Sequence, residues 1–105
     1  MVVIRNPEDA KNVVEYEVRG NSVDFEEGSL AINLKKREAD EVRTIDICRD
    51  YFGDLVIGAA AGDTYVAQII IPARRYTEEE GSEGSVQAPV PFDIDRCTLV
   101  LWEER

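Results

Sequence analysis

The sequence predicts an all-β protein, a sandwich or a partly open barrel of about seven mostly antiparallel strands. Two observations favour this fold class. Between Val13 and Ile71, short stretches of alternating apolar and polar residues are separated by turn residues roughly every 8–12 positions. A last alternating stretch runs from Cys97 to Trp102. A chain of 105 residues has room for one domain, which we expect to span residues 1–105.

The first third of the chain predicts a short N-terminal helical turn and then a three-stranded meander. Asn6-Pro7-Glu8-Asp9 combines a capping Asn, a Pro at the first helical position and two acids near the positive end of the helix dipole. Strict alternation indicates strands after this turn, and tight turns separate them. The meander strands and their two turns are expected at residues 14–19, 20–21, 23–25, 27–28 and 30–34.

The middle of the chain leaves two alternatives open at residues 35–41. This segment is rich in helix formers, whereas residues 43–47 alternate strictly. We favour a hairpin with its tip at Glu38–Glu41, and a short helix is the alternative. Further strands are expected at 55–57 and 65–71. The three consecutive isoleucines Ile69, Ile70 and Ile71 are typical of a strand that is buried on both faces.

A change of composition at residues 77–91 predicts a long, flexible acidic loop before the last strand. The segment is rich in Glu, Gly and Ser, and two prolines follow. Carboxylates in loops are ligands that calcium prefers. We therefore consider a calcium site, although a plain solvated loop is the favoured interpretation. The candidate ligands in this loop are Glu78, Glu79, Glu80 and Glu83.

Asp93-Ile94-Asp95 is a second acidic candidate. In a strand, the carboxylates of Asp93 and Asp95 would share one face, where they could hold a hard cation or act as an acid–base pair. The simpler interpretation, which we favour, is a polar entry into the last strand.

Histidine is absent from the chain, and cysteine occurs twice, at Cys48 and Cys97. The absence of histidine excludes Ser-His-Asp and Cys-His catalysis and histidine-bearing zinc sites. We interpret both cysteines as reduced structural thiols, with a cross-link between them as the alternative. We expect no cofactor and no enzymatic activity, since no pairing of a nucleophile with a base is visible.

The net charge of −10 argues against two classes of partner. Nucleic acids and anionic membrane surfaces both attract cationic proteins, so the field of this chain has the wrong sign. No segment resembles a signal peptide or is apolar for long enough to span a membrane. We therefore expect a cytoplasmic protein.

These observations favour a non-enzymatic interaction or structural subunit of a homo-oligomer or a larger assembly, of the kind found in virion and tail structures. Ile69, Ile70 and Ile71 are interface candidates because so small a domain cannot cover both faces of their strand. Arg74 and Arg75 could bind the acidic loop of a neighbouring copy, or they could discourage aggregation of the adjacent strand. The alternative function is a small monomeric module whose acids hold a cation or a cationic ligand.

Overall fold

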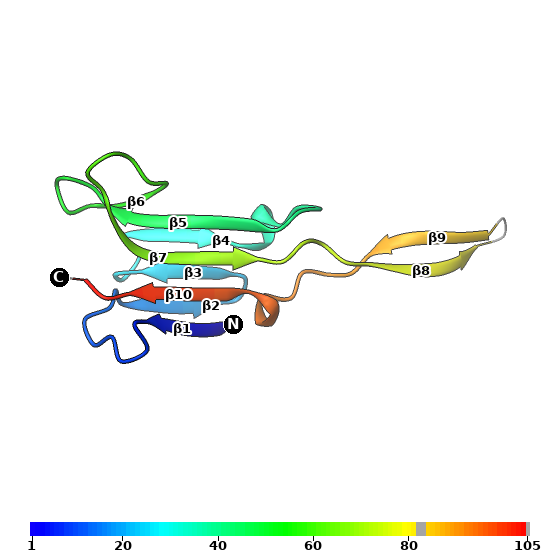
Figure 1. Cartoon of the computed structure of the whole chain (residues 1–105). Coiled ribbons are helices and arrows are strands. Elements are labelled where there is room, and N and C mark those ends of the chain that lie inside the picture. Colours follow the sequence, from blue (N-terminus) through cyan, green and yellow to red (C-terminus); the bar gives the residue numbers. More distant parts are fainter. Residues whose placement is uncertain (82–83, 105) are drawn as a thin grey trace.

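The computed structural model describes residues 1–81 and 84–104, and within these ranges ten strands form three sheets (Figure 1). Two one-turn 3-10 helices, η1 (Lys35–Arg37) and η2 (Ile94–Arg96), are the only helical elements of this part of the chain. The prediction of an all-β protein is therefore confirmed. None of the three sheets closes into a barrel.

The largest sheet has five strands in the spatial order β1-β10-β7-β5-β6. Its central strand, β7, pairs with antiparallel neighbours on both sides, and β1 pairs in parallel with β10 at one edge. A bulge interrupts the pairing of β5 with β7 between Ile47 and Cys48. The bounds of these strands are β1 (Val2–Asn6), β10 (Thr98–Trp102), β7 (Thr64–Ile71), β5 (Arg43–Arg49) and β6 (Leu55–Ile57).

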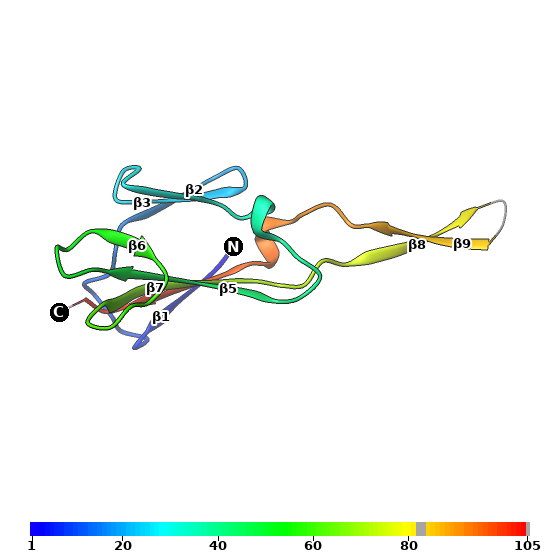
Figure 2. The same cartoon turned by 90° about the horizontal axis from the view of Figure 1, so that it is seen from above.

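The second sheet is the antiparallel meander β2 (Tyr16–Arg19), β3 (Ser22–Phe25) and β4 (Leu30–Asn33), which confirms the sequence expectation. Gly20 has a φ of +57°, which suits the first central position of a type II′ hairpin turn. In Figure 2 the meander is stacked over the five-stranded sheet.

The core lies between these two layers. On the five-stranded sheet, pairing places buried side chains in rows that cross β10, β7 and β5. One row is Leu99, Ile69 and Ile45, and the next is Leu101, Ala67 and Ile47. Val23, Phe25, Ile32 and Leu34 oppose them from the meander and its exit. Burial of these aliphatic side chains on both layers is what holds the sheets together.

The third sheet is a hairpin of β8 (Tyr76–Gly81) and β9 (Gly84–Pro89), which we call the arm. It projects along the strand direction of the five-stranded sheet and stretches the molecule to 59 Å in length, against 27 and 22 Å in the other dimensions (Figure 1). The expectation of a loop at 77–91 was thus wrong for the described residues, because Tyr76 to Gly81 pair with Gly84 to Pro89 in continuous register.

The N-terminal helical turn is also a wrong prediction. Val2, Val3 and Ile4 are β-branched and pair with β10, while Asn6-Pro7 leads only into a turn that Ala10 N closes on Pro7 O at 2.9 Å. Asn6 is the last residue of β1, and no helix lies between it and β2. Because β1, β8 and β9 were not expected, the described residues form ten strands rather than about seven.

Residues 35–41 do not form the favoured hairpin. Strands β4 and β5 belong to different sheets, so the segment between them crosses from one layer to the other. Leu34 is fully buried at the start of this crossing, and Asn33 Oδ1 accepts a hydrogen bond from Lys36 N at 3.1 Å. One turn of 3-10 helix follows, which agrees with the short-helix alternative.

Candidate interaction surfaces

The side of the five-stranded sheet away from the meander, which we call the outer face, carries no second layer of strands from the described residues (Figure 2). Pairing again places its side chains in rows across β1, β10, β7 and β5. The first row is Val2, Thr98, Ile70 and Thr44, and the second is Ile4, Val100, Gln68 and Asp46.

The outer face has a polar half and an apolar half. Toward β5 it is polar, and Gln68 Nε2 donates to Asp46 Oδ1 at 2.9 Å. Toward β1 it is apolar, because Ile70, Val100, Ile4 and Val2 follow one another across three strands. Ile70 and Val100 are half-buried, whereas Val2 and Ile4 are exposed. The apolar half of the outer face therefore runs to the edge of the sheet.

Strand β1 forms that edge, since it has a neighbour on one side only. All five of its residues are exposed. Val2 is 52% exposed, Val3 39% and Ile4 48%, which are large values for aliphatic side chains in a strand. Exposed aliphatic side chains that cluster on one surface are typical of contact sites.

The base of the arm is fastened to the loop before β5. Arg74 N donates to Ala39 O at 2.8 Å, and the Arg74 guanidinium contacts the carboxylates of Glu38 at 3.3 Å and Asp40 at 3.4 Å. The hydroxyl of Tyr76 donates to Asp40 as well. These contacts set the direction in which the arm leaves the body. Arg74 therefore already binds acids of its own chain.

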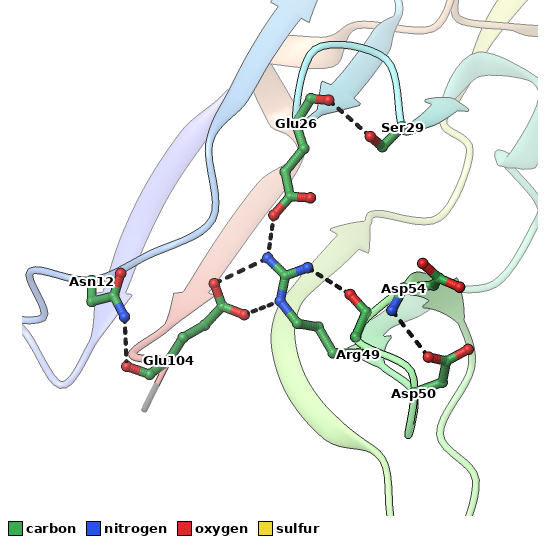
Figure 3. A network of polar contacts seen from close by, with 8 residues as sticks. Asn12, Glu26, Ser29, Arg49, Asp50, Asp54 and Glu104 are labelled. Atoms are coloured by element: carbon green, nitrogen blue, oxygen red, sulfur yellow. Dashed lines mark hydrogen bonds and ion pairs between the residues drawn. The ribbon is translucent and has the colours of Figure 1, made fainter.

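A network around Arg49 joins parts of the fold that are distant in sequence (Figure 3). The guanidinium of Arg49, on β5, binds the carboxylates of Glu26, from the β3–β4 turn, and Glu104, which follows β10. It also donates to Gly53 O at 3.0 Å. Asn12 Nδ2 donates to Glu104 O at 3.0 Å and brings the N-terminal segment into the same cluster.

Electrostatics and turn geometry both reflect this network. The hydrogen bonds that the Arg49 guanidinium donates to Glu104 and Glu26 raise the pKa of Arg49 above its ordinary value, so the guanidinium stays charged. Glu26 has a φ of +49°, in the left-handed region, and this turn aims its carboxylate at Arg49. No local pattern in the sequence marks the members of this network, so it was not among the expected sites.

The sequence-based acidic candidates do not come together in the described residues. Glu78 is an exposed residue of β8, Glu79 and Glu80 lie on the same strand, and Glu83 lies outside the described residues. Asp93 and Asp95 were expected in a strand, and this expectation is wrong. They lie at the 3-10 helix η2 instead. Within residues 1–81 and 84–104, no three His, Cys, Asp or Glu side chains gather in a metal-binding arrangement.

The two aspartates at η2 have structural partners. Asp93 Oδ1 accepts from Asp95 N at 3.0 Å and so caps the 3-10 turn. Asp95 Oδ1 lies 3.2 Å from the amino group of Met1, which ties the start of β1 to the entry of β10. The carboxylate of Asp93 therefore caps η2, whereas the carboxylate of Asp95 contacts the amino group of Met1.

Of the three isoleucines considered as interface residues, two are not available to a partner. Ile69 and Ile71 are fully buried in the core, and only Ile70 reaches the outer face. The alternation of β7 explains the difference, because successive side chains point to opposite faces of a strand. Arg75 is exposed beside the arm, and its carbonyl accepts from Val90 N at 2.8 Å.

Both cysteines are buried and are not joined to one another. Desolvation raises the pKa of the Cys48 and Cys97 thiols above the ordinary value of 9.0. Each thiol is therefore kept in its protonated, unreactive form at neutral pH.

A cleft with a volume of about 380 Å³ lies between β1 and the meander. Arg5 and Arg19 line it together with the acids Glu15, Glu17, Asp24 and Glu27 and with Val13, Val14 and Tyr16. Arg19 forms surface ion pairs with two of these acids, Glu17 at 2.8 Å and Asp24 at 3.6 Å. Arg5 is the one residue of β1 in this lining.

No protein-family model, curated protein or solved structure matches this chain. None of the helices in the described part of the chain is both long and apolar enough to cross a lipid bilayer.

Proposed function

We propose that this chain is a non-enzymatic structural subunit that packs against copies of itself in a homo-oligomer or a larger assembly, as subunits of virion or tail structures do. The observation that carries the proposal is the apolar half of the outer face, from Ile70 and Val100 to the exposed Val2 and Ile4. Water contact with such a surface is unfavourable, and covering it with a second copy removes that cost.

The arm gives independent support. It extends beyond the two stacked sheets, and among the side chains that the structure describes, the core consists of residues from other elements (Figure 1). A hairpin that is held at its base and projects from the body reaches surfaces that the body of the same chain does not. Contacts between subunits are the simplest use for such an element.

Solution mass tests the proposal. Light scattering on a sizing column, over a wide range of protein concentration, should show species heavier than the 11.8 kDa chain. Added salt should strengthen the association, because it screens the repulsion between copies that each carry a charge of −10 and leaves apolar contacts intact. A strict monomer at every concentration would contradict the proposal.

Two further measurements in the same experiment separate the competing explanations. If salt dissociates the oligomer, then ion pairs between acidic and basic segments hold the copies together, and the apolar outer face is not the interface. If calcium alone changes the mass or the melting temperature of a monomeric chain, a cation-binding module explains the acids better.

A further inference from the structure

Strand β1 has few of the features that keep exposed sheet edges from pairing, and its one charged side chain, Arg5, donates a hydrogen bond to Ala10 O at 2.7 Å. Natural edge strands are protected by charges, by Pro, by a bulge or by very short length. Strand β1 has five residues paired in continuous register with β10, and Val2, Val3 and Ile4 at its start are uncharged and exposed. Neither acid nor lysine occurs among residues 1–6.

The other edges of the two stacked sheets differ from β1 in these respects. Strand β6 has only three residues. Strand β2 alternates its apolar residues with Glu17 and Arg19, which form an exposed ion pair. Strand β4 exposes only Ala31 and Asn33, which are small or polar. Strand β1 is therefore the edge of this two-layer body that is best suited to accept another strand.

The hydrogen bonds between β1 and β10 show which backbone groups of β1 remain available to a further strand. Val2 N donates to Cys97 O at 2.9 Å, and Asn6 O accepts from Glu103 N at 3.2 Å, so these residues turn their backbone groups toward β10. Backbone groups of successive residues in a strand point to opposite sides. The N–H and C=O groups of Val3 and Arg5 therefore face away from the sheet, where the structure describes no neighbouring strand.

We propose that β1 pairs antiparallel with β1 of a second copy about a two-fold axis at Val3, an inference that rests on the self-association proposed above. In this register, Val3 of each copy exchanges both backbone hydrogen bonds with Val3 of the other. Val2 of one copy lies opposite Ile4 of the other on the outer face, and the reverse pair follows by symmetry.

Self-complementarity is the reason to choose a second copy as the occupant. The run Val2-Val3-Ile4 meets its own reverse with an aliphatic side chain at every position, and such cross-strand pairs stabilise sheets. Two chains of charge −10 repel each other wherever acids meet, and the first six residues hold none. The pairing also joins the apolar halves of the two outer faces into one band across six strands, β7, β10 and β1 of each copy.

The expected affinity is modest. An edge contact of this length buries less than the about 1,200–2,000 Å² of a stable interface. We therefore expect a dissociation constant in the micromolar range, which sedimentation equilibrium measures directly.

Charge substitution at the axis gives the sharpest test. In Val3→Lys, the lysine of one copy faces the same lysine of the other copy across the axis. This repulsion should raise the dimer dissociation constant by about tenfold or more, and Val3→Glu should behave in the same way. An equimolar mixture of the two variants should recover the dimer, because lysine then faces glutamate. Val42→Lys, at an exposed valine outside β1, is the matched control and should leave the affinity unchanged.

Cysteine cross-linking tests the register without a charge. Antiparallel partners at the axis have Cα atoms about 5.5 Å apart, within disulfide reach, so Val3→Cys should form a covalent dimer on mild oxidation. Val2→Cys is the control, since the two copies of residue 2 would lie about 7–8 Å apart on a diagonal. The native cysteines are buried and should not interfere.

The outcomes separate this inference from the proposed function. An oligomer that is unaffected by Val3→Lys, or that cross-links equally well from positions 2 and 3, overturns the pairing at β1 and leaves self-association standing. A wild-type chain that is monomeric throughout overturns both. Failure of the mixed charge variants to recover the dimer overturns the two-fold axis.

Discussion

Replacing Arg49 by methionine should destabilise the fold more than any other substitution of a charged residue. Methionine keeps most of the side-chain volume but removes the cation that binds Glu26 and Glu104. It leaves these two carboxylates close together without compensation. The three side chains are 24%, 35% and 19% exposed, so each is partly shielded from water.

The magnitude follows from those contacts. A charge-assisted hydrogen bond contributes about 1.5–3 kcal/mol net in proteins, and fully exposed ion pairs contribute about 0–1 kcal/mol. The Arg49 pairs lie between these limits. Two of them, together with the repulsion that remains between Glu26 and Glu104, should be worth about 3 kcal/mol.

Urea unfolding measures this loss. Trp102 is the only tryptophan of the chain and lies on β10 beside Tyr65, with ring centroids 6.4 Å apart, so its fluorescence reports on the folded sheet. Arg43→Met is the control, because Arg43 is an exposed arginine on the same strand. A loss of less than about 0.5 kcal/mol in Arg49→Met would refute the reasoning, since that is the usual scale of a surface substitution.

Three further expectations concern the core, a turn and the thiols. Ile69→Ala should lose about 2–5 kcal/mol of unfolding free energy because its side chain is fully buried, whereas Ile70→Ala, on the outer face, should lose clearly less in the same urea assay. Glu27→Gly should raise the unfolding free energy by about 0.5–1 kcal/mol, since residue 27 has a φ of +55°, and an unchanged midpoint would contradict this. Both thiols should resist a thiol reagent in the native state and react after denaturation. Because burial raises the folded pKa of both thiols above 9.0, their contribution to stability should be complete below that pH and fall above it, and Cys97→Ala should flatten the fall.

Local patterns predicted the elements whose partners are near in sequence. The meander follows from alternation and from Gly20. The three isoleucines predicted a strand buried on both faces, but only Ile69 and Ile71 are fully buried, and Ile70 on the outer face is half-buried. Strand β1 was missed because its partner is β10, at the other end of the chain, and because Asn6-Pro7-Glu8-Asp9 resembles a helix start. Tertiary pairing outweighed this local preference.

The arm and the Arg49 network were beyond sequence reasoning for a different reason. Glu, Gly and Ser are poor strand formers, so the arm forms by backbone pairing in a segment whose composition indicates a loop. Arg49 is separated by 23 residues from Glu26 and by 55 from Glu104. Nothing in the sequence near any one of these residues indicates the other two.

The direction of the arm gives the pairing at β1 a consequence for the shape of the assembly. The arm projects along the strands of the five-stranded sheet, and an antiparallel two-fold reverses the strand direction in the second copy (Figure 1). The two acidic arms would then point to opposite ends, which separates their charge and leaves both able to contact further copies. Small-angle X-ray scattering of the dimer should therefore give a maximum dimension clearly above the 59 Å of one chain. A dimer that stays near that length would have its arms side by side, and this arrangement is incompatible with an antiparallel β1 pair.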